Sequence, residues 1–528
     1  MPFATTHCVA LDGATGHLID VQADVSAGQI ATVLVGRPDA ALSESRDRCR
    51  MAVINSGWEW PNTRRTTILL SPADLPKRGT HFDVSIAVAV LGALDVVPPE
   101  SLEDTVFIGE LTLSGGLRSV RGVLPMVLAA RERGVVRAFV PEPQVGEAAL
   151  AGAVEVIGMR SLRQVVAELC GDEVPEAPPV AAMSGSRLLA WRGRDRLDDV
   201  DMSEVRGMPD ARFAAEVAAA GGHHLLLSGP KGSGKTTLAE RIPGLLPDLS
   251  REEAIELTTM HSLAGALEPG DELLTRPPYA APHHDASKAA LVGGGSGQVR
   301  PGEISRAHCG VLFMDEFPLF RTDVIDALRE PLESGDITIA RAEESVTLPA
   351  RSLVVLAANP CPCGNFAVVA RKSRCSCTET ARRAYQSRVR GPITDRIDIT
   401  RHLSPLTAAQ ADDLVRPEST EAVRARVQSA RLRQEERYAG EGWRLNGQVP
   451  GPALRDRWPL VAAAQASLDQ QMFSGRLTQR GAVRVHRIAW TLADLGGVDR
   501  PGSHEVEVAV RLRSGDPLMA ATVARRVG

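Results

Sequence analysis

Residues 229–236 combine glycines, a lysine and a threonine at a spacing that suits phosphate chemistry. They read Gly-Pro-Lys-Gly-Ser-Gly-Lys-Thr and fit the pattern G-x-x-x-x-G-K-[ST] in full. Glycines let backbone N–H groups converge on phosphate oxygens, Lys235 adds a point charge for the β and γ phosphates, and Thr236 can hold Mg²⁺. A chance glycine-rich turn is the alternative, but an apolar stretch before the loop and a helical one after it favour nucleotide binding. We therefore predict ATP and Mg²⁺ as cofactors, held by Gly229, Pro230, Lys231, Gly232, Ser233, Gly234, Lys235, Thr236 and Thr237.

Two carboxylates follow the next apolar run, at residues 311–314. Asp315 and Glu316 stand at the end of this predicted strand. Such an arrangement would place Asp315 beside Mg²⁺ and Glu316 beside the water that attacks the γ phosphate. An ordinary strand end is the alternative, and the phosphate loop upstream makes the catalytic interpretation the better one.

Two more polar residues could complete an ATPase site. Asn359 ends the apolar run at 353–358 and could sense the γ phosphate, although a turn asparagine before Pro360 would look the same. Arg396 lies in Gly-Pro-Ile-Thr-Asp-Arg-Ile-Asp at 391–398 and could reach a neighbouring subunit's nucleotide as an arginine finger. A surface salt bridge is the alternative for Arg396.

Four of the eight cysteines are concentrated in a loop at 361–377. They form two C-x-C pairs, tighter than the common C-x₂-C knuckle, and could bind one tetrahedral zinc ion; free thiols or a redox-labile pair are the alternatives. The candidate zinc ligands are Cys361, Cys363, Cys375 and Cys377. The cations between the pairs could contact DNA, although solvated charge is the simpler account. They are Arg371, Lys372 and Arg374.

These residues require an α/β framework of several domains. The chain has 528 residues, of which 44% are apolar, enough for about three domains of about 150 residues each. A stretch rich in proline, small residues and acids at 172–186 reads as a linker. We predict a small α/β domain at 1–171, a P-loop ATPase domain with a parallel sheet at 187–405, and an all-α region at 406–528. Helices are expected at 39–56, 83–94, 322–332, 421–438 and 478–495.

The overall composition restricts the partners. The net charge is −5, so contact with nucleic acid would need a local basic surface, and aromatic residues make up only 4%, which disfavours a surface of base-stacking platforms. The N-terminus has no basic region followed by an apolar run, and the most apolar stretch, 84–97, is too short to span a bilayer. We expect a cytoplasmic protein.

The order of these motifs resembles the magnesium-chelatase-like AAA+ ATPases, and specifically the YifB/ComM family, over nearly the whole chain. The matching stretches include Pro-His-His at 282–284, Gly-Gly-Gly at 293–295, Pro-Gly-Glu-Ile-Ser at 301–305, Leu-Arg-Glu-Pro-Leu-Glu-Ser-Gly at 328–335 and Asn-Pro-Cys-Pro-Cys-Gly at 359–364. The resemblance implies that Asn359 is sensor 1, Arg396 the finger and Arg480 the sensor 2 arginine of a helical lid, with Arg484 and Arg487 as nearby alternatives.

The same family carries two inserts that face the channel of a hexamer. Residues 291–302 match the first insert and 337–348, a strand-turn-strand pattern around Glu343 and Glu344, match the second. These are candidate DNA-contacting loops or, alternatively, plain surface hairpins. Their nearby cations are Lys288, Arg300 and Arg341.

The N-terminal region resembles the Lon protease domain that begins members of this family. The similarity lies at 35–39, 71–79 and 108–111. Proteolysis would need a serine with a lysine as its base. Aligned by eye, those positions hold Asp83 and Met126, so we expect a binding or assembly module without the catalytic dyad.

The resemblance implies a homo-hexameric, ATP-driven DNA motor that promotes branch migration of recombination intermediates in natural transformation and homologous recombination. DNA of no particular sequence is the expected partner, with a recombinase as a further one. The alternatives are a chelatase-type motor that remodels a protein partner for metal insertion, and a regulatory scaffold with weak ATPase activity. The presence of Lys235, Asp315 and Glu316 disfavours the scaffold.

Overall fold

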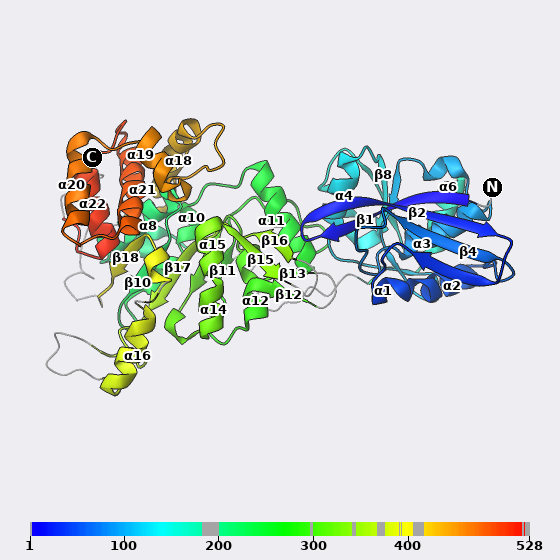
Figure 1. Ribbon diagram of the computed structural model, residues 1–528, viewed down its shortest axis with the longest axis horizontal. Helices are drawn as coiled ribbons and strands as arrows, with labels where there is room; N and C mark the ends of the chain where they lie inside the picture. Colours follow the sequence, from blue (N-terminus) through cyan, green and yellow to red (C-terminus); the bar gives the residue numbers. More distant parts are fainter. Residues whose placement is uncertain are drawn as a thin grey trace.

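A computed structural model describes residues 3–181, 200–295, 299–340, 345–366, 375–389, 391, 393–404, 417–519 and 522. Figure 1 shows two α/β parts side by side, with the C-terminal helices beyond the second and one helix, α16, projecting from it. The predicted α/β architecture with several parts is confirmed.

The first part is a seven-stranded sheet with the order β3-β4-β2-β1-β5-β8-β9. Burial alternates along β2, because every second side chain of a strand faces the core. This pattern favours a strand with one face in the core. Helix α3 covers one face and α4 the other, and each has its own apolar core. The strands of the sheet are β1 (Phe3–Asp12), β2 (Thr15–Ser26), β3 (Ala31–Val35), β4 (Arg65–Ser71), β5 (Thr105–Phe107), β8 (Arg137–Pro141) and β9 (Glu155–Met159). Strands β6 (Glu110–Leu111) and β7 (Leu117–Arg118) pair with each other in a separate hairpin. The helices are α1 (Ala40–Ser43), α2 (Ser45–Asn55), α3 (Asp83–Ala93), α4 (Val123–Glu132), α5 (Val145–Ala149) and α6 (Leu162–Cys170).

Helix α3 contains most of the apolar stretch noted in the sequence, and all eleven of its residues are buried in this domain. Across the described residues, no helix has the length and apolar character needed to cross a membrane. Asp83 and Met126, the positions aligned with the Lon dyad, are both buried. Asp83 is paired with Arg48 at 2.8 Å.

Two predicted helices are each divided in two. The expected helix at 39–56 is interrupted at Glu44, between α1 and α2. The expected helix at 322–332 is interrupted at Leu328, between α14 (Thr322–Ala327) and α15 (Arg329–Ser334). Pro331 explains the second break, because it has no N–H to donate to the carbonyl four residues earlier.

The first half of the predicted linker is attached to the first domain. Residues 172–181 form no helix or strand. Gln164 Nε2 donates to the Pro175 carbonyl at 2.8 Å, and Ser119 Oγ donates to the Ala181 carbonyl at 3.2 Å. The second half, from residue 182, lies outside the described residues.

The second part has a five-stranded sheet with the order β11-β14-β17-β10-β18. All four neighbouring pairs are parallel, as predicted. Side chains of β10 and β17 alternate between two apolar cores, one on each face of the sheet. The strands are β10 (Leu225–Ser228), β11 (Tyr279–Ala280), β14 (Val311–Met314), β17 (Leu353–Ala358) and β18 (Ile399–His402). The further helices are α8 (Pro209–Gly221), α9 (Lys235–Ala239), α10 (Ile242–Leu245), α11 (Arg251–Ala264), α12 (Lys288–Val292), α13 (Glu303–Arg306) and α16 (Glu379–Val389).

Both segments predicted to be inserts form short hairpins, on the side of the second part that meets the first. The first insert pairs β12 (Gly293–Gly294) with β13 (Arg300–Pro301), and the second pairs β15 (Asp336–Ala340) with β16 (Ser345–Pro349). The tip of the second hairpin, with Arg341, Glu343 and Glu344, lies outside the described residues. Its β16 strand packs against the β1–β2 turn, because a Cβ built on Gly13 would lie 2.6 Å from Val346 Cγ1.

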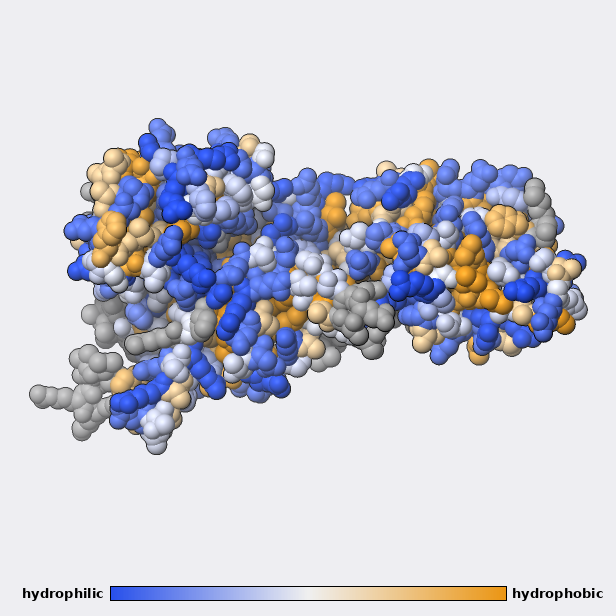
Figure 2. All heavy atoms as spheres, viewed as in Figure 1, coloured by the Kyte–Doolittle hydropathy of each residue, from blue (hydrophilic) through white to orange (hydrophobic). Residues whose placement is uncertain are grey.

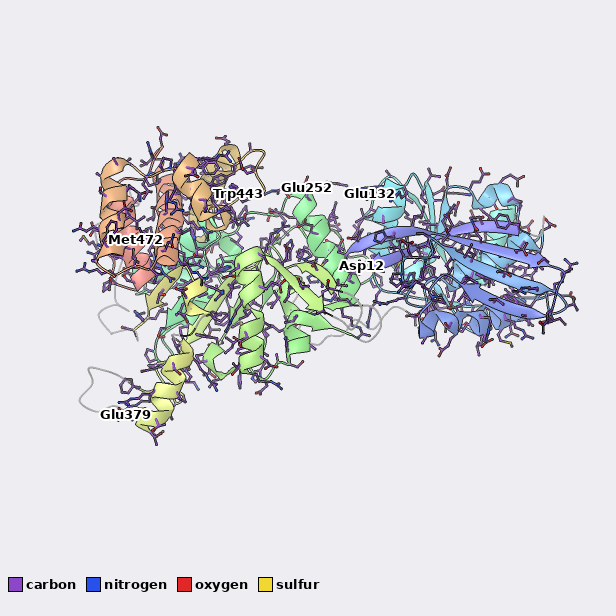
Figure 3. The ribbon with its side chains drawn as sticks, viewed as in Figure 1. Asp12, Glu132, Glu252, Glu379, Trp443 and Met472 are labelled. Atoms are coloured by element: carbon purple, nitrogen blue, oxygen red, sulfur yellow. The ribbon has the colours of Figure 1, made fainter. Side chains whose placement is uncertain are left out.

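A second contact joins the two parts. Ser262 of α11 donates from its hydroxyl to Glu147 Oε1 at 2.6 Å, and its carbonyl accepts from the Gly122 N–H at 3.3 Å. Figure 3 places Asp12, at the end of β1, where the two parts meet.

The described C-terminal residues, 417–519 and 522, are helical with connecting turns, as predicted from residue 406 onward. Buried polar contacts attach them to α8, because Arg426 pairs with Glu216 at 2.8 Å and Gln434 Nε2 donates to the Ala220 carbonyl at 3.0 Å. The helices are α18 (Thr420–Arg437), α19 (Gly451–Arg457), α20 (Ala462–Phe473), α21 (Gln479–Gly496) and α22 (Ser503–Ser514).

Candidate ATPase site

The predicted phosphate loop connects β10 directly to α9. Gly232 and Gly234 have φ angles of 79° and 82°, which L side chains rarely adopt. Gly229 is required for space, because a Cβ there would lie 2.5 Å from the Leu403 carbonyl oxygen. The loop therefore has the strand-loop-helix context and the backbone shape that a phosphate cradle needs.

Lys235 lies inside this loop with its ammonium group fully engaged. Its Nζ donates to the carbonyls of Gly229 at 2.7 Å and Pro230 at 3.0 Å, and to Asn359 Oδ1 at 3.0 Å. Burial lowers the pKa of Lys235, and the negative charges of Asp315 and Glu316 oppose that shift. The ammonium is thus fixed at the centre of the predicted site.

Thr236 and Asp315 meet as a candidate pair of Mg²⁺ ligands. The Thr236 hydroxyl donates to Asp315 Oδ2 at 3.1 Å. Adjacent ligands of an octahedral Mg²⁺ ion, each about 2.1 Å from the metal, lie about 3.0 Å apart. Hard oxygen donors at this spacing fit the ion, which would neutralise negative charge on the phosphates.

Glu316 occupies a backbone conformation that non-glycine residues rarely adopt, with a φ of 50°. Its N–H donates to Asp315 Oδ1 at 2.8 Å, and its Oε1 accepts from Asn359 Nδ2 at 2.9 Å. The two carboxylates therefore point in different directions, with Asp315 toward Thr236 and Glu316 toward Asn359. Such a division suits one metal ligand and one group that orients water.

Asn359 connects the separate parts of the site. Its side chain accepts from Lys235 and donates to Glu316, so one amide fixes both groups. Its backbone N–H donates to the phenol oxygen of Tyr385 at 3.2 Å. The sequence gives little sign of Tyr385, which is a single aromatic residue in an arginine-rich segment with no recognisable motif around it.

The predicted finger and sensor 2 residues form ion pairs with side chains outside the phosphate loop. Arg396 Nε pairs with Glu333 at 2.8 Å, and Arg480 pairs with Asp395 at 3.7 Å. Arg480 is 69% exposed, whereas Arg484 is bonded to the buried Asp398 at 2.5 Å. Arg487, the other alternative for sensor 2, donates from Nε to the Val449 carbonyl. Arg480 is therefore the freest of the three to reach a nucleotide, and its assignment stays a prediction.

The sulfur atoms of the four clustered cysteines lie close together, although eleven residues separate the two pairs in the sequence. Sγ of Cys361 lies 3.4 Å from that of Cys363 and 3.6 Å from that of Cys375, and all four sulfur atoms lie within 4.8 Å of one another. Four sulfurs about 2.3 Å from a tetrahedral Zn²⁺ would be separated by about 3.8 Å. Backbone hydrogen bonds from Asn365 and Ser376 lower the pKa of Cys363 to about 6, which favours its thiolate, whereas burial raises the pKa of Cys361. The donor set and spacing fit zinc, while Arg371, Lys372 and Arg374 lie outside the described residues.

Comparison with known proteins agrees with this site. The family described as Magnesium chelatase, subunit ChlI, matches residues 201–411, and its C-terminal counterpart matches 417–513. The family described as Subunit ChlI of Mg-chelatase matches 21–144. Phosphate loop, carboxylate pair and parallel sheet therefore define a P-loop ATPase of the AAA+ class that uses ATP and Mg²⁺.

Relatives extend over nearly the full chain. Rv2897c of Mycobacterium tuberculosis is 44% identical over 513 residues, which cover 97% of this chain and 99% of that protein. YifB of Escherichia coli is 37% identical over 521 residues, 98% of each chain, and the competence protein ComM of Haemophilus influenzae is 36% identical over 499 residues, 94% of each chain. The chain belongs to the YifB/ComM family of magnesium-chelatase-like proteins.

Proposed function

We propose that this chain forms a ring that uses ATP to drive branch migration of recombination intermediates, in homologous recombination and natural transformation. The observation that carries the proposal is the separation of the site into two parts. Lys235, Asp315, Glu316 and Asn359 contact one another or the phosphate loop, whereas Arg396 forms an ion pair with Glu333. An arginine placed in this way would act on the nucleotide of a neighbouring copy, and a complete site would then need a ring.

DNA as the substrate is supported by the relatives and by local charge. One relative is named as a competence protein, which supports a role in transformation. Lys288 and Arg300 are exposed at the first insert, and Arg383 is exposed on α16. A grip on the phosphate backbone, without base reading, agrees with the few aromatic residues and the acidic total charge.

The ATPase reaction follows from the placement of the side chains. Lys235 would bind the β and γ phosphates, while Thr236 and Asp315 would hold Mg²⁺, which neutralises charge on the transferred group. Glu316 would orient the attacking water, and Asn359 would fix Glu316 in position. A finger from the next copy would stabilise the charge that develops in the transition state.

The proposal is tested by measuring ATP hydrolysis with and without DNA. We expect DNA to stimulate the wild-type protein, and we expect the stimulation to fall steeply between about 50 and 200 mM salt, since counterions compete for the phosphates. Lys235→Ala should lose ATP binding and hydrolysis, and Glu316→Gln should keep binding but lose hydrolysis. A rate of ATP hydrolysis that DNA does not change at any salt concentration would refute a DNA motor.

A zinc ion at the cysteine cluster is part of this proposal. It would hold the loop at 361–377 in one shape and so present the cations of that loop to DNA. We expect one zinc per chain in purified protein, lost in Cys361→Ser and Cys375→Ser. Cys170→Ser, at a partly exposed cysteine of α6, is the matched control and should keep the metal. Metal-free protein in which Cys361 and Cys363 form a disulfide would instead establish a redox-labile pair.

A chelatase-type motor is the second candidate, because the matching family models describe magnesium chelatase subunits. It predicts hydrolysis stimulated by a protein partner and unaffected by DNA. The measurement described above therefore separates the two functions.

A further inference from the structure

Helix α16 is attached to the ATPase domain by very few side chains. Tyr385 is the buried residue of the helix, with 5% of its surface exposed. Figure 1 shows α16 projecting away from the domain, and Figure 2 shows its surface as largely hydrophilic. Glu379 lies at its outer end in Figure 3. A polar helix of this kind gains little from its own apolar burial, so its position depends on its few specific contacts.

Those contacts reach both of the predicted catalytic segments. The Tyr385 phenol oxygen accepts from the Asn359 N–H at 3.2 Å, at the point where β17 has ended. Arg388 donates to the Pro318 carbonyl at 3.0 Å, two residues after Glu316. The inner end of α16 therefore lies against the segments that carry the sensor and the second carboxylate.

The cysteine cluster links Asn359 to the first residue of α16. Cys361 follows Asn359 by two residues, and Cys375 precedes the start of α16 by four, yet their sulfur atoms are 3.6 Å apart. Gly364, between the first cysteine pair and the rest of the loop, lies against the phosphate loop. A Cβ on Gly364 would be 3.4 Å from Lys231 Cβ and 3.8 Å from Asn359 Cγ. Holding the cysteines together thus fixes where α16 begins relative to Asn359.

We infer that Tyr385 is a positioning residue for Asn359, and that the cysteine cluster and α16 regulate ATP hydrolysis through this one hydrogen bond. Beyond the last paired residue of β17, the Asn359 N–H needs a buried acceptor, and the Tyr385 phenol provides it. Burial raises the pKa of Tyr385 to about 12, so the phenol stays neutral over the working pH range. A shift of α16 would move the acceptor, and with it the amide that aligns Lys235 and Glu316.

The inference rests on ATPase activity and not on branch migration, so it is tested without DNA. Tyr385→Phe removes only the acceptor oxygen. We expect kcat for ATP hydrolysis to fall about tenfold with KM for ATP changed less than about twofold, because the site would bind ATP normally but align it poorly. Tyr438→Phe is the matched control, since it removes another buried hydroxyl, bonded to Asn446 at 2.7 Å in the C-terminal helices. Equal kcat values for the two variants would overturn the inference.

Two double variants separate positioning from general loss of structure. Tyr385→Phe should have little further effect on kcat in an Asn359→Ala background, because the residue that it positions is gone. Cys375→Ser should lower kcat in the wild type and add little to Tyr385→Phe. Fully multiplicative effects in either pair would contradict action through Tyr385. Thermal melts of every variant show whether it is folded, and inactive wild-type protein would signal failure of the ATPase assignment itself.

Discussion

Replacing Asn359 by aspartate tests the proposed chain of contacts through a change of charge alone. Asn359 Nδ2 lies 2.9 Å from Glu316 Oε1, and its Oδ1 lies 3.0 Å from Lys235 Nζ. In Asn359→Asp the amide that donates to Glu316 becomes a carboxylate oxygen at the same place. The other oxygen, Oδ1, stays 3.0 Å from Lys235 Nζ, and this positive charge favours the ionised form of the new carboxylate.

The size of the effect follows from the distance. Two unit charges 2.9 Å apart repel by about 6 kcal/mol at an effective dielectric constant of 20 and by about 1.4 kcal/mol at 80. A repulsion of 1.36 kcal/mol raises a pKa by about one unit. The pair of carboxylates should therefore lose its last proton at a pH about one to four units higher than a single carboxylate would. Partial exposure of Glu316 places the expectation at about one to two units.

The assay is the pH dependence of kcat between about pH 5 and 9. A protonated Glu316 cannot orient water, so the acid limb of the Asn359→Asp profile should move upward by about one to two units and activity should recover at high pH. Asn359→Ala adds no charge, so it should lower kcat at all pH values and move the limb less than Asn359→Asp does. Superimposable profiles for the two variants would refute the contact between Asn359 and Glu316 as the basis of catalysis.

Three further predictions follow from other parts of the chain. Arg396→Ala should lower kcat by about 10³-fold, and mixing it with wild-type protein should reduce activity more than dilution does; a linear response would contradict a finger acting between copies. Burial lowers the pKa of His223 and of His224 from 6.5 to about 4, so between these pH values the unfolded chain binds protons that the folded chain does not. The free energy of unfolding should therefore fall as the pH decreases from about 6.5 to about 4. A denaturation midpoint that stays constant over this range would contradict the prediction. Gly13→Ala should weaken the contact between the two α/β parts by about 1–3 kcal/mol and speed proteolysis between them, because its Cβ would lie 2.6 Å from a β16 side chain, whereas Gly134→Ala shares the strained backbone without the clash and should not.

The centre of the site could be predicted because its residues are encoded locally. Lys235 and Thr236 are held by a loop whose shape depends on three closely spaced glycines, at 229, 232 and 234. Asp315 and Asn359 each follow an apolar strand, and the carboxyl ends of parallel strands meet at one edge of a sheet. The closeness of the cysteine pairs was predicted in the same way, from spacing and side-chain chemistry.

The connections between distant segments could not be predicted from local pattern. Tyr385 reaches Asn359 only because the loop at 361–377 folds back on itself, and no periodicity in the sequence encodes that return. Gly13 meets the hairpin strand that contains Val346 through packing between the two α/β parts, which are far apart in the sequence. The break at Glu44 was also missed, because the sequence around it carries neither proline nor glycine to mark an end.

Movement of a synthetic four-strand DNA junction by purified protein tests the central claim most directly. We predict that wild-type protein separates the junction into its products in the presence of ATP and Mg²⁺, and that Glu316→Gln binds the junction without moving it. Strand movement should fail with a non-hydrolysable ATP analogue and should not depend on the junction's sequence. An active ATPase that binds the junction and leaves its strands unmoved would contradict the account.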